Sequence, residues 1–304
     1  MLSNKAINKN ITTSNLSNYT KSLILLMKPR VMSLVIFTCA VGFLTSSPDV
    51  KTFDAIISII LVAIGAGAAG CLNMWYEADV DALMSRTCLR PIPTGKVNKK
   101  QALTFGIFLS IFSVGVLYYF TNLLSAFLLF FTIAFYLFVY TIWLKRKTPQ
   151  NIVIGGVAGS LPPVIGWAIS TNSISLTSIS LFLIIFFWTP SHFWALSLYK
   201  ADDYKKAKIP MMPITDGKEK TKLYILIYSL LMLPIVILPY VINFSGLIYL
   251  IPTMILTFYY NFICIDLYMY EKNKFDLKKA KKVFAYSILY LFLIFVFFLL
   301  DYLI

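Results

Sequence analysis

The chain has 304 residues, of which 59% are hydrophobic and only 13% are charged, and its mean hydropathy is +0.78. Soluble domains are about 45–50% apolar and about 25% charged, so this composition excludes a pair of ordinary soluble domains and predicts an integral membrane protein. The four cysteines form no CxxC pair, which excludes a disulfide framework and a zinc site.

Nine apolar segments are long enough to cross a bilayer, which takes a helix of about 20 residues. They cover approximately residues 31–48, 53–72, 102–120, 123–143, 152–170, 178–199, 223–243, 246–265 and 283–303. We therefore expect an all-α membrane protein with nine transmembrane helices. A single transmembrane domain would cover residues 29–304 and follow a polar cytoplasmic N-terminal tail, residues 1–28.

Lysine and arginine are distributed unevenly between the predicted loops. Of the 27 basic residues, 26 lie on the side of the N-terminus, and only Lys51 lies opposite. Because cytoplasmic loops carry the basic excess, the N-terminus is expected in the cytoplasm and the C-terminus in the periplasm. The net charge of +14 then reflects topology, which favours the lipid bilayer as partner and argues against nucleic acid.

The N-terminal segment bears on the membrane in which the chain resides. Residues 1–22 are polar and hold no apolar run of the kind that a secretory signal requires. We expect a bacterial cell inner membrane. The alternative is the mitochondrial inner membrane, because the same segment has no acidic residue, as in transit peptides.

The acidic residues gather in two of the predicted cytoplasmic loops. Seven of the 13 follow either the second or the sixth span. Four helices separate these loops, which predicts two four-helix repeats in the same orientation and one further helix. Each repeat would bring one acidic loop to the same end of the bundle. Small residues at 65–70 and the GxxxG pair Gly155 and Gly159 are interpreted as sites of close helix packing.

The first acidic segment places oxygen ligands at helical spacing. Asn73, Glu77 and Asp81 stand four residues apart and share one face if the second helix extends through them, whereas Asp79 projects elsewhere. Carboxylate and amide oxygens can hold Mg²⁺ while a substrate phosphate completes its octahedron. The alternative is a solvated helix end.

Two arginines follow at the same spacing. Arg86 and Arg90 precede Pro91 and Pro93, which predict a loop. Guanidinium groups bind phosphate through paired hydrogen bonds. Only four of the 27 basic residues are arginine, so two of them here favour phosphate binding over a merely charged loop.

The second acidic segment follows the sixth span. His192, Tyr199 and Asp203 fall within about 40° of each other on a continuous helix. Pro190 removes one helical hydrogen bond and is expected to kink this span. His192 is the only histidine, and the alternative to a site role is a hydrogen-bonded structural residue.

The spacing of Asn73, Glu77 and Asp81 resembles the NxxxDxxxD diphosphate motif of the UbiA superfamily of membrane prenyltransferases. Four separated blocks narrow the resemblance to the protohaem IX farnesyltransferases, or haem O synthases. They comprise Met84, Arg86, Thr87, Arg90 and Pro91; Asn151, Ile152, Gly155, Gly156, Ala158, Gly159, Pro162, Pro163, Gly166 and Trp167; Trp188, Thr189, Pro190, His192, Phe193 and Trp194; and Asp203, Tyr204, Ala207, Pro210, Met211 and Pro213.

Two departures from the superfamily pattern affect the metal site. Glu77 stands where the motif has Asp, although its longer side chain also coordinates metals. The second loop lacks the repeated DxxxD and offers Asp203, next to Asp202, as its counterpart. The number of Mg²⁺ ions is therefore left open, and Lys200 is a candidate to neutralise the diphosphate.

The resemblance implies a UbiA-type helical bundle and a prenyl transfer. Farnesyl diphosphate and haem B would be the substrates, Mg²⁺ the cofactor, and haem O the product after water addition. The implied roles are metal binding and catalysis by Glu77, Asp81 and Asp203 with Asn73, diphosphate binding by Arg86, Arg90 and Lys200, and haem binding by His192 and Tyr199.

Two other functions are weighed against this one. A UbiA-type enzyme acting on a quinone precursor would share the acidic motif but not the blocks around His192 and Asp203. A secondary transporter would need ionisable residues near the middle of its spans, and the spans here are nearly free of charge. A downstream haem A synthase is a candidate protein partner for which the residues carry no signal.

Overall fold

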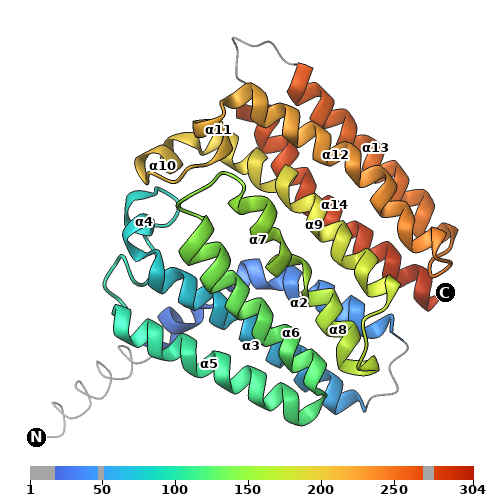
Figure 1. The fold of residues 1–304 in the computed structure, drawn as a ribbon, viewed down its shortest axis with the longest axis horizontal. Helices are drawn as coiled ribbons and strands as arrows, with labels where there is room; N and C mark the ends of the chain where they lie inside the picture. Colours follow the sequence, from blue (N-terminus) through green and yellow to red (C-terminus); the bar gives the residue numbers. More distant parts are fainter. Residues whose placement is uncertain (1–17, 47–50, 270–276) are drawn as a thin grey trace, which may run out of the picture.

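The computed structural model describes residues 18–46, 51–269 and 277–304, and these residues are folded into helices and connecting loops (Figure 1). The first 17 residues of the expected tail lie outside the described residues. After a short helix Asn18–Leu26, the elements are α2 Pro29–Leu44, α3 Thr52–Tyr76, α4 Ala78–Leu83, α5 Lys99–Phe120, α6 Leu123–Ala134, the π-helix η1 Phe135–Leu144, α7 Asn151–Ser160, α8 Pro162–Thr171, α9 Leu176–Tyr199, α10 Ala201–Lys206, α11 Met212–Thr215, α12 Lys218–Val241, α13 Leu247–Met269 and α14 Leu277–Leu303.

The helices confirm a multi-pass membrane protein. Among the described residues, eight helices are long and apolar enough to span a membrane, or nine if Asn18–Leu26 and α2, bent by 52°, count as one span. Lys28 makes the turn between these two with a left-handed backbone, φ 55°. The segment predicted as a polar tail thus ends in a helix, whose Leu26 is buried against Cys71 and Met74 of α3.

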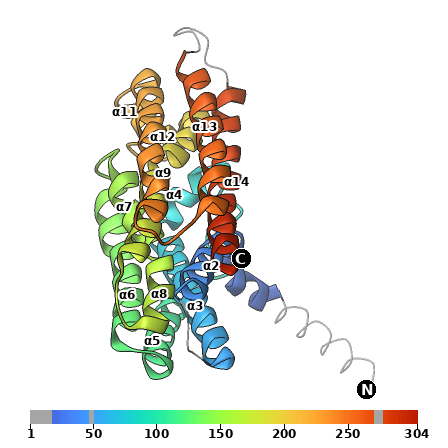
Figure 2. The same ribbon diagram turned by 90° about the vertical axis from the view of Figure 1, so that its right-hand side faces the viewer.

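The two halves of the bundle repeat one arrangement. The first half pairs α3 with α5, and the second pairs α9 with α12. Each of α3 and α9 ends at a single non-helical residue, Glu77 or Lys200, after which a helix of six residues follows. α4 and α10 lie at the same end of the bundle (Figures 1 and 2), as the predicted repeat requires. α14 packs against α9 and α13.

Local sequence accounts for several helix boundaries. Capping boxes start α5 at Asn98 and α9 at Ser175, where the side chain accepts a hydrogen bond from the third residue of the helix. The predicted fifth span is split at Leu161, where Pro162 occupies the first position of α8. In contrast, Pro190 lies inside α9, which is helical on both sides of it.

The first spans of the two halves, α2 and α7–α8, approach each other closely, backbone to backbone, where α2 meets α8. A Cβ atom at Gly42 of α2 would overlap the backbone carbonyl oxygen of Pro163, and one at Gly166 of α8 would overlap that of Cys39. Backbone atoms cannot move aside as a side chain can. Any larger residue at these two glycines would therefore push α2 and α8 apart.

Of the two glycines in the predicted GxxxG pair, only Gly155 is at a site of close packing. A Cβ atom at Gly155 would overlap the ring of Tyr140 in η1, so this glycine makes room for the tyrosine. A Cβ atom at Gly159 would meet no atom within 4 Å. Close packing is thus confirmed for Gly155 and is not seen at Gly159.

These two environments predict opposite responses to the same substitution. Gly166→Ala should destabilise the folded protein by about 1–3 kcal/mol, the usual range for overpacking, because the added methyl group meets backbone. Gly159→Ala, the matched control, should leave stability nearly unchanged. Thermal unfolding of the two purified variants in detergent measures the difference, and equal midpoints would contradict the assigned packing.

Candidate active site

The first acidic segment forms one buried face at the end of α3. Asn73, Glu77 and Asp81 are each only 2% exposed. The backbone N–H of Glu77 donates to the carbonyl of Asn73 at 2.9 Å, and that of Asp81 donates to Glu77 at 2.8 Å. Helical hydrogen bonding therefore continues across the break at Glu77, which keeps the three side chains on a common face as predicted.

Asp79 lies off this face, as predicted. It accepts hydrogen bonds of 3.0 and 2.9 Å from the two terminal nitrogens of Arg146, whose guanidinium lies 5.2 Å from the ring centre of Tyr76. Partial burial raises the pKa of Asp79, but the hydrogen bonds and charge of Arg146, together with backbone hydrogen bonds, hold that pKa below its usual value. Asp79 is thus part of a solvent-exposed ion pair.

Each group of the acidic face is paired with a basic side chain from another segment. Lys145 Nζ lies 2.5 and 2.6 Å from the two carboxylate oxygens of Glu77. Arg90 Nη1 donates to both oxygens of Asp81 at 2.8 Å. Lys28 Nζ donates to the amide oxygen of Asn73 at 2.6 Å. Both carboxylates are therefore paired with cations, and the Asn73 amide oxygen accepts a hydrogen bond from a lysine amine.

Lys145 remains charged at this position. Burial lowers the pKa of Lys145, but the adjacent Glu77 carboxylate and its hydrogen bond raise it above its usual value. Sequence reasoning assigned Lys28 and Lys145 to membrane topology alone and missed both as site residues. The sequence did offer one signal that could have identified them, because both lysines lie beside the ends of predicted spans.

The π-helix η1 positions Lys145 and the neighbouring polar side chains. The Lys145 N–H donates to the carbonyl of Tyr140, five residues earlier, and the Thr141 hydroxyl donates to the carbonyl of Tyr136. Thr141 Oγ1 in turn accepts a 3.0 Å hydrogen bond from the amide of Asn73. π-Helical turns are frequent at functional sites, and this one joins η1 to the acidic face.

Asp203 belongs to the second half and meets the loop that follows α4. Its carboxylate accepts a 2.6 Å hydrogen bond from the Ser85 hydroxyl and lies 3.9 Å from Lys200 Nζ. The Ser85 hydrogen bond is the main cause that lowers the pKa of Asp203 below its usual value. The two acidic loops therefore meet at the same end of the bundle, as the predicted repeat requires.

The end of the bundle where the two acidic loops meet, which we call the mouth, carries more positive than negative charge. Three buried carboxylates, Glu77, Asp81 and Asp203, are accompanied by four cations, namely Arg86, Arg90, Lys145 and Lys200, and by the buried amine of Lys28. Arg86 is exposed, forms no ion pair with any residue that the structure describes, and lies within electrostatic range of Tyr140 and Tyr199. Such an excess of cations suits an anionic ligand.

His192 lies at the interface between α9 and α14. Its Nδ1 shares a 2.6 Å hydrogen bond with the Ser287 hydroxyl, and its ring stacks on Trp188 at 4.3 Å and on Phe284 at 4.6 Å. Tyr199 also contacts Phe284, with ring centres 5.7 Å apart. His192 and Tyr199 thus share the face of α9 that meets α14.

Asp203 does not continue that face. The helix breaks at Lys200, with φ −114° and ψ 19°, and α10 directs Asp203 to Ser85. The expectation of one face for His192, Tyr199 and Asp203 assumed a continuous helix, so it holds for the first two residues only.

Residues 34–294 match the profile of the UbiA prenyltransferase family. The chain belongs to this family. The protoheme IX farnesyltransferase of Pelagibacter ubique (strain HTCC1062) is 69% identical over 301 residues, which are 99% of each chain. The protoheme IX farnesyltransferase of Azorhizobium caulinodans is 50% identical over 275 residues, 90% of each chain.

Solved structures share the UbiA fold. A digeranylgeranylglyceryl phosphate synthase aligns with a TM-score of 0.77 at 18% identity, over 93% of this chain and 98% of the other. A UbiA homolog from Archaeoglobus fulgidus bound to DMAPP and Mg²⁺ aligns with a TM-score of 0.68 at 18% identity, over 90% and 99%. At this identity the similarity establishes the fold alone, and it confirms the predicted UbiA-type helical bundle.

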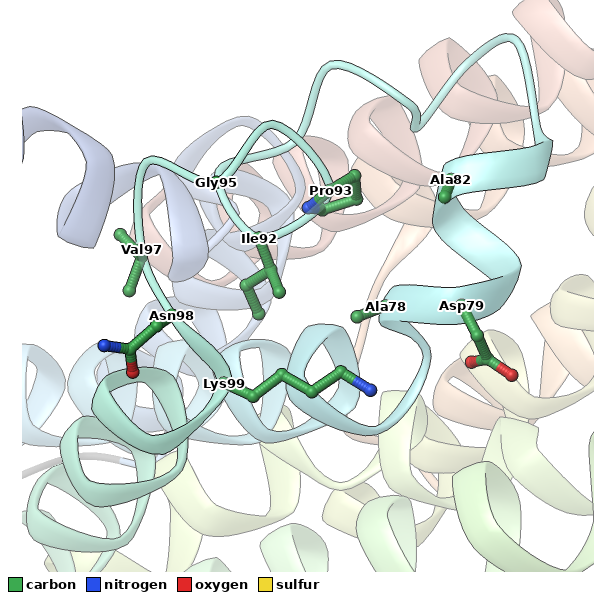
Figure 3. Close-up of a pocket in the computed structure, with 9 residues that line it drawn as sticks. All are labelled: Ala78, Asp79, Ala82, Ile92, Pro93, Gly95, Val97, Asn98 and Lys99. Atoms are coloured by element: carbon green, nitrogen blue, oxygen red, sulfur yellow. The ribbon is translucent and has the colours of Figure 1, made fainter.

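A pocket of about 380 Å³ lies between α4, the loop that follows it and the start of α5 (Figure 3). Its lining includes Ala78, Asp79 and Lys99, but neither Glu77 nor Asp81. Within the described part of the chain, no three His, Cys, Asp or Glu side chains are grouped to hold a metal ion by themselves. A metal at the acidic face would thus need ligands beyond these side chains.

The buried pair of Glu77 and Lys145 should be far more sensitive than the neighbouring surface pair. Lys145→Met leaves a buried carboxylate unpaired, which typically costs about 3–5 kcal/mol, and adding Glu77→Gln should recover most of the loss. Arg146→Met, the matched control, breaks only the exposed pair with Asp79 and should cost at most about 1 kcal/mol. Unfolding midpoints of the wild type, the two single variants and the double variant measure this coupling. Equal losses of stability in Lys145→Met and Arg146→Met would contradict it.

Proposed function

We propose that this UbiA-family chain is a membrane-bound protoheme IX farnesyltransferase, a haem O synthase. It transfers the farnesyl group of farnesyl diphosphate to a vinyl group of haem B, adds water and releases diphosphate. The single observation that carries this proposal is 69% identity over 99% of both chains to the Pelagibacter ubique protoheme IX farnesyltransferase. The cationic mouth supports it, because a diphosphate is a highly charged anion.

The acidic face fits Mg²⁺ in its donor chemistry. Glu77 and Asp81 supply two carboxylates and Asn73 an amide oxygen, which are hard ligands of the kind that Mg²⁺ prefers, and phosphate oxygens can supply the remainder. When bound, the metal would neutralise the diphosphate and make it a better leaving group. Among the acidic residues of the second half that the structure describes, only Asp203 is buried, and the neighbouring Asp202 is exposed, which favours a metal held chiefly by the first half.

The cations of the mouth stabilise the leaving group. Charge develops on the diphosphate as the bond between C1 of the farnesyl group and the diphosphate oxygen breaks with its electron pair. Arg86, Arg90 and Lys200 bind the diphosphate, and Lys145 lies beside the same acidic face and adds positive charge. Cationic side chains placed here lower the barrier because they act where negative charge appears.

The allylic cation is consumed without a strong protein base. The electron pair of the haem vinyl group forms the new carbon–carbon bond, and water adds to the resulting cation and releases a proton. Tyr136 and Tyr140 of η1, stacked at 5.2 Å, line the side of the site next to Glu77 and Lys145. Aromatic faces attract cations, so these two rings shield the intermediate.

The proposal includes a membrane orientation and a domain organisation. The mouth, with most of the basic residues, faces the cytoplasm of a bacterial cell, and residues 29–304 form one transmembrane domain. His192 and Tyr199 serve the haem side of the site. A haem A synthase that consumes the product is the protein partner that this reaction implies.

The decisive experiment uses membranes that contain the full-length chain. They are incubated with haem B, farnesyl diphosphate and Mg²⁺, and extracted haem is analysed by mass spectrometry. The expected product has gained one farnesyl group and one water. Unchanged haem together with prenylation of an added quinone precursor would replace the proposal by the alternative substrate class.

Substitutions on the acidic face should abolish turnover selectively. Glu77→Gln or Asp81→Asn removes one charged ligand and should lower the rate about 100-fold or more, the order expected when one charge-stabilising group is lost. Asp79→Asn, the matched control, changes only an exposed ion pair and should be mild. Product formation per amount of inserted protein measures these effects, and an indispensable Asp79 with a dispensable Glu77 would refute the facial assignment.

His192 is proposed to contact haem, as an axial ligand or by orienting the water. His192→Ala should then shift the haem absorption spectrum and weaken haem binding, or reduce the hydroxylated product while binding persists. Ser287→Ala removes the hydrogen bond to Nδ1 but keeps the ring, and serves as control. Normal binding and normal product with a lower protein yield would give His192 a packing role.

A further inference from the structure

The beginning of α14 brings a lysine to the end of α9. Lys281 Nζ lies 5.9 Å from the ring centre of Tyr199. Lys281 is exposed and forms no ion pair with any residue that the structure describes. Two residues earlier, Lys279 is paired with Asp266 of α13 at 2.5 Å. Of these two lysines, Lys281 is the one whose charge is free for a ligand.

Lys281 continues a stripe that contains the proposed haem-side residues. Lys281, Phe284 and Ser287 are spaced by three residues and lie on neighbouring turns of α14. Phe284 stacks on His192 and contacts Tyr199, and Ser287 bonds to His192. Along the interface between α9 and α14, the Lys281 ammonium and the Tyr199 phenol lie at the end of the bundle. The Phe284 ring follows them, and the His192 imidazole comes next.

Tyr199 connects this stripe to the cationic mouth. It directly precedes Lys200, and Arg86 and Tyr204 lie within its electrostatic range. The Tyr199 hydroxyl forms no hydrogen bond with any described residue. α14 begins at the end of the bundle where α10 and α11 lie (Figure 1). A ligand between Lys281 and the mouth would therefore meet an available cation and an available hydroxyl.

The proposed second substrate has the chemistry to fit this place. Haem B carries two anionic propionates on the edge of the macrocycle opposite its vinyl groups, and the macrocycle itself is apolar. We propose that Lys281, with the Tyr199 hydroxyl, binds a propionate of the porphyrin substrate. This inference rests on the proposed haem farnesylation. The pair would hold one edge at the membrane surface and direct the vinyl edge across the mouth to the diphosphate.

The cations nearer the acidic face are less suited to this role. Lys145 and Arg90 are engaged with Glu77 and Asp81 and stand where the diphosphate is proposed to bind. Lys281 has no carboxylate of the mouth beside it among the described residues. A single ammonium group matches a single carboxylate in charge, and a hydrogen bond between two ionised groups is stronger than one between neutral groups.

The test compares haem B with its dimethyl ester, in which both propionates are uncharged. Wild-type protein should have a KM for haem B about tenfold below that for the ester, the factor expected from one such interaction. Lys281→Met should raise the KM for haem B about tenfold and leave the KM for the ester and for farnesyl diphosphate unchanged. Lys281→Arg should retain most of the preference.

The neighbouring Lys282→Met is the matched control, because Lys282 lies 5.6 Å from the ring of Tyr259 on α13 instead of Tyr199. It should not change the preference. Equal effects of Lys281→Met on both porphyrins, or none, would overturn the inference. Titration of haem B and the ester without farnesyl diphosphate, followed by absorption, measures the same preference independently of turnover. If the preference is present but no farnesylated haem is formed, the proposed function fails and the propionate site stands.

Discussion

A carboxylate buried at the end of an apolar bundle is stable only if a cation or metal accompanies it. Glu77 and Asp81 are both almost completely buried, and each is paired with a basic side chain from another segment, Lys145 at the end of η1 and Arg90 in the loop after α4. Lys145 ties the end of η1 to α3, and Arg90 folds the loop after α4 back over its own start. The same pairs that satisfy the carboxylates therefore define the shape of the mouth.

The rest of the bundle brings the second half to that mouth. The glycines of α2 and α8 allow the first helices of the two halves to touch backbone to backbone. The loop after α4 then reaches the second half, where Ser85 bonds to Asp203. α14 closes the second half against α9 and places Phe284 beside His192. Packing in the bilayer region and polar contacts at its end thus act on the same two halves.

The spans and the acidic face could be predicted because both depend on local patterns. Hydropathy places the helices, and a period of 3.6 residues separates Asp79 from Glu77 and Asp81. The partners could not be predicted in the same way, since Lys145 is 68 residues from Glu77 and Lys28 is 45 residues from Asn73. The positive-inside rule alone also explains lysines near the ends of spans, so their presence there did not indicate site residues. The break at Lys200 and the π-helix have no comparable local signal, so the direction of Asp203 was mispredicted.

The two halves break their long helix in the same way but with opposite charge at the break, an acid at residue 77 and a base at residue 200. Two identical halves would bring the same charge to the mouth from both breaks, either two acids or two bases. Reversing the charge at one corresponding position makes the halves complementary. The first half thereby brings a carboxylate to the mouth and the second half an ammonium group, from corresponding positions of one duplicated scaffold.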